Sequence, residues 1–206
     1  MWVKIAFCCW VAFWSSSSFS EGQLNVAYGN ALAPWVLPDN NSGILVDIIS
    51  ASLNPEGYEI NNVYYPYARR ISSYRQGLVD VVSDINPLVI EREALDGYFS
   101  GIAYTYKNYA FTLKKNNYQF NKISDLKSYR LLSWQGATAT LGAEYSEMAL
   151  NNPFYSEHHN QELQIKMLFL GRVDVVQLDM QIFRHFRSKV QSEGVIDTQI
   201  EIDKFP

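Results

Sequence analysis

The chain has 206 residues, of which 48% are hydrophobic and 15% aromatic, and its formal net charge is −4. This composition excludes an intrinsically disordered chain, and an acidic chain without a long basic run is not expected to bind nucleic acid. The length suits one large domain or two small ones.

The N-terminal segment has the pattern of a removable secretion signal. Lys4 is followed by an apolar stretch over residues 5–14, and Ser18 and Ser20 place small side chains before a cut after Ser20. The stretch is too short to span a bilayer as a helix, which needs about 20 residues. We expect residues 1–20 to be a signal peptide and the mature chain to be exported to the periplasm; an uncleaved N-terminal helix is the alternative.

The mature chain is expected to use neither a metal nor another cofactor. Cys8 and Cys9 are the two cysteines of the sequence and lie in the signal segment, so no disulfide or thiolate metal site is expected. His158 and His159 are neighbours on a predicted strand and point to opposite faces, which prevents them from sharing one ion. The sequence has no nucleophile-elbow, phosphate-loop or zinc-protease motif, and no catalytic residue is predicted.

Strands and helices alternate along the mature chain. The first half predicts strands at 24–28, 58–65 and 79–83 and helices at 44–53 and 67–76. The second half predicts strands at 130–134, 154–158 and from 173, with helices at 138–150 and 161–170. Each half thus has the order βαβαβ, which favours an α/β fold with largely parallel strands.

A short echo supports two similar lobes. The sequence QGLVDVV at 76–82 reappears as LGRVDVV at 170–176, and each copy predicts a helix that ends on a glycine before a short strand. We expect lobe 1 at 21–107 and lobe 2 at 108–192. Residues 193–206 are expected to return to lobe 1, and to do so incompletely, because the sequence stops directly after a predicted strand.

Several motifs, in this order and spacing, resemble the bacterial extracellular solute-binding proteins of family 3, the polar amino-acid-binding periplasmic proteins of ABC importers. The resemblance covers roughly residues 22–200 and implies a type II periplasmic-binding-protein-like fold with a ligand cleft between the lobes. The motifs are Ala33-Pro34-Trp35, GILVDI at 43–48, Gln76-Gly77-x-Val79-Asp80, IERE at 90–93 before Tyr98-Phe99-Ser100, ISDLK at 123–127, QGAT at 135–138, and GRVD at 171–174 followed by Asp179.

The resemblance implies a clamp that closes on a small zwitterion, with an arginine and an acid on opposite lobes. Arg92 falls where family members place the arginine that grips the ligand carboxylate, and a guanidinium matches a carboxylate fork. Asp179 falls where many members have the acid that receives the ligand ammonium. The alternatives are a surface arginine paired with a neighbouring glutamate, and an aspartate that caps the following helix.

Three further ligand-binding residues are expected. Thr138 follows Gln135-Gly136-Ala137 at a predicted helix start, where free backbone N–H groups favour an anion, although an ordinary first-turn residue fits as well. Tyr67 falls where the family often has an aromatic residue that stacks on the ligand. Trp35 could add a second wall, and the alternative for both aromatic residues is a place in the core.

The stretch before Arg92 departs from the family pattern. Members that bind basic amino acids usually carry hydroxyl residues there, whereas this chain reads Asp84-Ile85-Asn86-Pro87-Leu88. Pro87 cannot donate a backbone hydrogen bond, and Ile85 has no polar group. Part of the expected carboxylate cradle is therefore missing, which points to a ligand other than a standard amino acid or to a decayed site.

The expected function is capture of a small polar, amino-acid-like ligand, either an amino acid or an organic acid, for an ABC importer. The expected partners are this ligand and the membrane subunits of the transporter, and the protein is expected to be a monomer. One alternative is a dehydratase-like enzyme acting on small carboxylates, which would need a general acid in the cleft. Another is a ligand sensor that serves no transporter.

Overall fold

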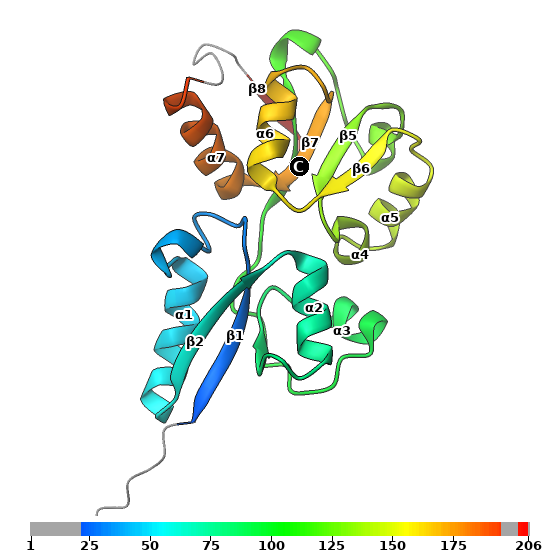
Figure 1. Cartoon of the computed structure of the whole chain (residues 1–206). Helices are drawn as coiled ribbons and strands as arrows, with labels where there is room; N and C mark the ends of the chain where they lie inside the picture. The colour runs from blue at the N-terminus through cyan, green and yellow to red at the C-terminus, as the bar shows by residue number, and fades with distance from the viewer. Residues whose placement is uncertain (1–21, 195–201, 206) are drawn as a thin grey trace, which may run out of the picture.

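The computed structural model describes residues 22–194 and 202–205, which form two lobes stacked one above the other (Figure 1). Each lobe has its own sheet, flanked by helices. The predicted signal peptide lies outside the described residues. Within the described ranges, no helix has both the length and the apolar character needed to cross a membrane.

Lobe 1 is built on a small parallel sheet with the strand order β2-β1-β3. Its strands are β1 (Gln23–Gly29), β2 (Glu59–Tyr65) and β3 (Val81–Val82). Its helices are α1 (Ile44–Leu53), α2 (Tyr67–Arg75), α3 (Pro87–Glu93) and the short 3-10 turns η1 (Pro38–Asn40) and η2 (Asn54–Glu56). Pro66 precedes α2 and Pro87 opens α3, both places where a missing backbone N–H costs nothing.

Lobe 2 has a five-stranded sheet with the order β6-β5-β7-β4-β8. Its strands are β4 (Asn108–Leu113), β5 (Leu131–Trp134), β6 (Tyr155–His158), β7 (Val175–Asp179) and β8 (Ile202–Phe205). Its helices are α4 (Ala137–Thr140), α5 (Ala143–Leu150), α6 (Gln161–Phe169), α7 (Met180–Ser192) and the 3-10 segments η3 (Lys114–Asn116) and η4 (Ile123–Ser128). Strand β5 pairs in parallel with β6 and β7, whereas β4 runs antiparallel to β7 and β8.

The predicted echo marks the same helix-to-strand join in both lobes. Gly77 and Gly171 follow α2 and α6 with φ of 69° and 66°, and the residue after each glycine donates its backbone N–H to the carbonyl five residues earlier. The carboxylate of Asp80 then accepts the N–H of Asn25 at 2.8 Å. In lobe 2 the carboxylate of Asp174 accepts the N–H of Arg130 at 2.9 Å. The repeated sequence is therefore a structural device that ties β3 to β1 in lobe 1 and β7 to β5 in lobe 2.

Two details differ from the sequence-based expectations. The helix expected at 138–150 is divided into α4 and α5, because Gly142 takes a left-handed φ of 92° between them. Residues 202–205 do not lie on lobe 1: they form β8, which pairs with β4 on the sheet of lobe 2, and Phe205 packs edge-on against Phe120 at 4.9 Å between ring centroids. The rest of the expected return segment, apart from 193–194, lies outside the described residues.

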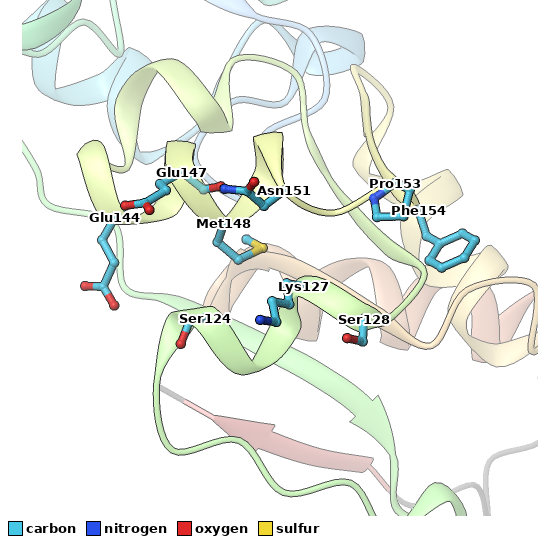
Figure 2. Close-up of a pocket in the computed structure, with 9 residues that line it drawn as sticks. All are labelled: Ser124, Lys127, Ser128, Glu144, Glu147, Met148, Asn151, Pro153 and Phe154. Atoms are coloured by element: carbon cyan, nitrogen blue, oxygen red, sulfur yellow. The ribbon is translucent and has the colours of Figure 1, made fainter.

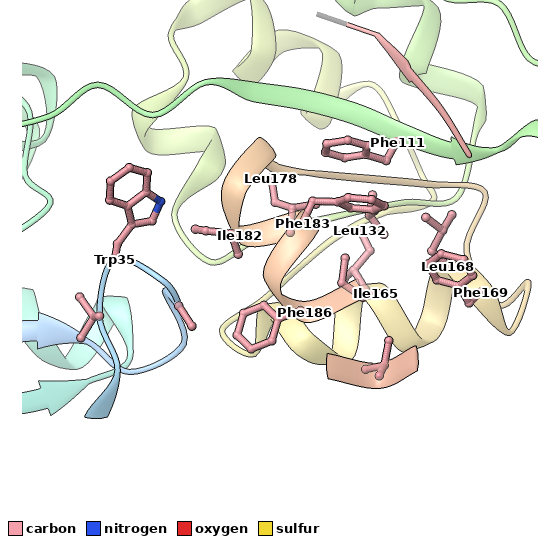
Figure 3. Packing of buried hydrophobic residues seen from close by; sticks show 14 of the residues in the cluster. Trp35, Phe111, Leu132, Ile165, Leu168, Phe169, Leu178, Ile182, Phe183 and Phe186 are labelled. Carbon is pink, nitrogen blue, oxygen red and sulfur yellow. The ribbon is translucent and has the colours of Figure 1, made fainter. Parts of the chain in front are cut away.

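The main core lies between the lobe 2 sheet and the helices α6 and α7 (Figure 3). Phe111 and Phe183 stack there at 3.8 Å with an interplanar angle of 9°. Leu178 and Ile165 are fully buried beside them. Trp35, on the loop after β1, belongs to the same cluster, so apolar packing continues from one lobe into the other.

Candidate functional site

The candidate site lies where the carboxyl ends of the parallel strands of the two sheets face each other. In the orders β2-β1-β3 and β6-β5-β7, the chain goes first to one side of the central strand and then crosses to the other side. Ligands of open α/β sheets bind at such switch points. The loop after β1 carries Trp35, β3 is followed by Asp84, and β5 is followed by the turn 135–138. Strand β7 ends on Asp179.

Asp179 joins the two lobes through a buried carboxylate. Its Oδ1 accepts the backbone N–H groups of Gln181 at 2.8 Å and Ile182 at 3.2 Å, which makes it the N-cap of α7. The same oxygen accepts the indole N–H of Trp35 from lobe 1 at 3.3 Å. Its Oδ2 accepts the backbone N–H of Lys107, on the crossing segment, at 2.9 Å. The capping role foreseen as an alternative is therefore present, together with an interlobe contact that the sequence did not reveal.

Aromatic side chains surround Trp35. The indole packs on Tyr104 at 3.9 Å between ring centroids and meets Tyr106 edge-on at 5.8 Å. Only 6% of Trp35 is exposed. Trp35 therefore lies in the core, as its alternative anticipated, and at the same time forms part of the boundary between the lobes.

A buried polar cluster that sequence reasoning missed lies next to these aromatic residues. Arg70, which is 4% exposed, donates through Nη1 to Asp84 at 2.7 Å and to the carbonyl of Ser83 at 3.0 Å. Tyr106 donates its hydroxyl to the other carboxylate oxygen of Asp84 at 2.6 Å. Burial and the nearby Asp84 raise the pKa of Tyr106 well above its usual value, so the hydroxyl remains a donor. The sequence signal for this cluster was Arg70, a charged residue at a buried position of α2.

Tyr67 lies against the turn after β5. A side chain added at Gly136 would place its Cβ 2.7 Å from the Tyr67 ring, so only glycine allows this approach, and Gly136 has a left-handed φ of 96°. The ring meets Trp134 edge-on at 6.5 Å, and the guanidinium of Arg70 lies 5.6 Å from its centre. Tyr67 therefore forms an interlobe contact as well.

Arg92 is at the last turn of α3 and its side chain is 41% exposed. Its Nε and Nη2 both donate to Oε1 of Glu93, at 3.1 and 2.8 Å. Desolvation lowers the pKa of Arg92, but its contacts with Glu93 and Tyr67 outweigh this and raise the pKa. The arginine is thus near Tyr67, with its donor edge occupied by the neighbouring glutamate.

Thr138 also has an internal partner, Glu157 at the end of β6. Glu157 Oε1 accepts the backbone N–H and the hydroxyl of Thr138, both at 2.9 Å, and Oε2 accepts the N–H of Gly136 at 2.7 Å. Tyr155 donates its hydroxyl to Oε1 at 2.7 Å. Burial, followed by the nearby Tyr145 and Glu157, raises the pKa of Tyr155, which keeps this donor protonated.

The structure thus groups the five predicted residues into two sets. Thr138, Tyr67 and Arg92 lie on one side, with Asn86 adding a bond from its side-chain N–H to the carbonyl of Thr140 at 3.3 Å across the lobes. Trp35 and Asp179 lie on the other side. The chain of contacts Tyr67–Arg70–Asp84–Tyr106–Trp35 connects the two sets.

No protein-family model matches the chain, and no match was found among curated proteins. Solved structures do match. The chain has the fold of amino-acid-binding proteins.

Three of the matching structures show how far the likeness extends. The GluR0 ligand-binding core in complex with L-glutamate has a TM-score of 0.68 at 18% identity, over 90% of this chain and 79% of that one. The ancestral amino-acid-binding protein AncCDT-1, a precursor of cyclohexadienyl dehydratase, has a TM-score of 0.64 at 18% identity, over 90% of this chain and 78% of that one. An ABC uptake transporter substrate-binding protein from Streptococcus pneumoniae with bound histidine has a TM-score of 0.60 at 14% identity, over 89% of this chain and 77% of that one. The predicted two-lobed α/β fold is confirmed.

A different hollow is found on the outer side of lobe 2, between η4 and α5 (Figure 2). It is open to solvent and measures about 570 Å³. It is lined by Ser124, Lys127, Ser128, Glu144, Glu147, Met148, Asn151, Pro153 and Phe154. None of the predicted ligand residues lines it, and it lies away from both switch points, so we place the candidate site between the lobes. The described part of the chain has no group of three or more residues suited to hold a metal ion.

Proposed function

We propose that this protein is a solute-binding protein that captures a small polar, amino-acid-like ligand between its lobes. The observation that carries the proposal is the meeting of two switch points, with polar and aromatic side chains from both lobes in contact across them. Trp35 of lobe 1 bonds to Asp179 of lobe 2, and Tyr67 of lobe 1 packs on Gly136 of lobe 2. The neighbours in structure bind amino acids in sites of the same fold, which supports this reading.

Within this proposal the five predicted residues surround the ligand. Tyr67 and Trp35 supply aromatic walls, Asp179 provides negative charge for an ammonium group, and Arg92 and Thr138 lie where a carboxylate would be received. Each of the last two already has a glutamate partner, so a ligand carboxylate would have to displace a side chain of the protein. The proposed setting is the periplasm, with a monomer delivering the ligand to the membrane subunits of an ABC importer.

Catalysis is the weaker alternative. It is suggested by AncCDT-1, which is described as a precursor of a dehydratase. A dehydratase needs a proton donor beside its substrate, whereas the carboxylates of Asp84, Asp179 and Glu157 are each engaged as acceptors of hydrogen bonds from the protein. Binding is therefore the function that the geometry supports better.

A thermal-shift screen of the chain from residue 21 onward tests the proposed function. The panel contains amino acids, the corresponding amines without the carboxylate, and small organic acids, because the fold alone does not determine the ligand. A ligand at 100 times its dissociation constant should stabilise the folded state by about 2.7 kcal/mol, which is visible as a raised melting temperature. A cooperative melt that no compound of the panel shifts would contradict the proposal.

A further inference from the structure

The position where lobe 2 would receive a ligand carboxylate already holds one. Glu157 accepts four hydrogen bonds there, from the backbone N–H groups of Gly136 and Thr138 and from the hydroxyls of Thr138 and Tyr155, at 2.7 to 2.9 Å. All four donors are directed at one carboxylate, and bonds between neutral donors and an ionised acceptor are stronger than neutral ones. A second carboxylate cannot use these donors while Glu157 remains in place.

The positive groups at the site are likewise engaged by carboxylates of the protein. The Nε and Nη2 atoms of Arg92 form the edge that could grip a carboxylate, and both donate to Glu93. Arg70 is buried and paired with Asp84 at 2.7 Å. The two cations therefore have their counter-charges on their own lobe, and the lobe 1 wall is close to neutral.

The lobe 2 wall, in contrast, has two negative charges, Asp179 and Glu157, that form no ion pair within the described part of the chain. The donors to Asp179 are the Trp35 indole and three backbone N–H groups, and the donors to Glu157 are all neutral. Among the ion pairs formed within residues 22–194 and 202–205, none includes either carboxylate. An uncompensated pair of charges beside an interlobe site attracts a cation and repels an anion.

We propose that Glu157 determines specificity by occupying the carboxylate position, so that the preferred ligand is a cationic amine without a carboxylate. This inference rests on the proposed binding function and names its ligand class. The bound amine lies beside Glu157, and its apolar part lies against Tyr67. A zwitterionic amino acid would bring its carboxylate towards the side chain of Glu157 and lose affinity through like-charge repulsion.

Matched ligand pairs that differ only in the carboxylate test the inference directly. Isothermal titration calorimetry compares arginine with agmatine, lysine with cadaverine, and histidine with histamine. We expect at least one amine to bind about tenfold or more tightly than its amino acid. Amino acids that bind as tightly as their amines, or more tightly, overturn the inference while leaving the proposed function intact. If no amine binds, the inference also fails, and the broader screen then decides the proposed function separately.

Variants of Glu157 give a second test of the inference. Glu157→Ala vacates the four donors and should lower the preference for the amine over the amino acid about tenfold or more. Glu157→Gln keeps an acceptor oxygen for Thr138 but removes the charge, so it should weaken amine binding while the melt stays cooperative. Glu147→Gln, an exposed charge on α5, is the matched control and should change neither affinity. An amine preference that is the same in wild type and both Glu157 variants contradicts the inference; if Glu157→Ala does not fold, Glu157→Gln decides.

Discussion

Single residues at the lobe boundary show how closely the two halves of the site fit. Gly136 is the clearest case, because it combines a left-handed φ of 96° with direct contact to the Tyr67 ring. Glu157 is another, since it saturates the donors of the turn that contains Gly136. Gly136 acts through a contact between the lobes, whereas Glu157 acts within lobe 2 by binding the turn that follows another strand.

Replacement of Gly136 by alanine should destabilise the protein more than the same change at Gly142. Both glycines have φ above 90°, so both substitutions cost backbone strain, but only the Cβ at position 136 meets the Tyr67 ring. We expect a loss of about 1–3 kcal/mol for Gly136→Ala from strain and overpacking together. Urea unfolding measures it. Equal losses for the two variants would show that the interlobe contact does not matter, and Tyr67→Ala should relieve the excess.

At the scale of elements, the sequence repeated at 76–82 and 170–176 forms the same helix-to-strand connection in each lobe and links two strands of its sheet. Asp174 binds the backbone N–H of Arg130 and pairs with its guanidinium at 2.6 Å, while Asp80 makes the corresponding backbone bond in lobe 1. Hydrogen bonds from Arg130 hold the pKa of Asp174 below its usual value. The ionised carboxylate is therefore the form that stabilises lobe 2.

The lowered pKa of Asp174 predicts a dependence of stability on pH. A carboxyl whose pKa is lower in the folded state stabilises the fold above its unfolded value of about 3.9, and this contribution is lost as pH falls through the folded value. Asp174→Asn should lower the free energy of unfolding by about 1 kcal/mol at pH 7, because it removes the hydrogen-bonded ion pair with Arg130. The loss stays this small because the pair is partly exposed to solvent. The difference from wild type in urea unfolding should shrink as pH falls below about 4. Asp96→Asn, an exposed control, should show no such trend; a difference for Asp174→Asn that persists at low pH would contradict the assignment.

Much of the fold could be predicted because its signals are local. The alternation of apolar strands with helices and the glycine-ended joins at 77 and 171 depend on short stretches of sequence, and they predicted the two lobes. The placement of β8 on lobe 2 could not be predicted, because a short strand can pair with any open edge of suitable pattern. The break at Gly142 was missed because a single glycine within a helical pattern is often tolerated.

The candidate site was harder to predict than the fold. The five residues were chosen by their places along the chain, and the structure adds partners that lie far away or on another element for four of them. The bond between Trp35 and Asp179 joins positions 144 residues apart, and Glu157 on β6 accepts from Thr138 on α4. Such contacts depend on how two lobes meet, which spacing within one lobe does not encode. Arg70 and Asp84 were missed for the same reason, since their pairing appears only when α2 lies over the end of β3.

At the scale of the whole molecule, the two lobes form a single unit through contacts at their facing edges. Apolar packing reaches from Trp35 into the lobe 2 core, and Asp179 bonds to the crossing segment as well as to lobe 1. A ligand held between the lobes must therefore respond to changes on either lobe. The open hollow on the outer side of lobe 2 is the rival location.

The most direct test of the central claim is a calorimetric titration of the best ligand from the screen against three variants. Tyr67→Ala on lobe 1 and Glu157→Ala on lobe 2 should each change the dissociation constant about tenfold or more, because a buried stacking or charged contact is worth roughly 1.4 kcal/mol or more. Lys127→Ala, in the outer hollow, should leave it unchanged. Binding that is lost in Lys127→Ala and retained in both interlobe variants would contradict a site between the lobes.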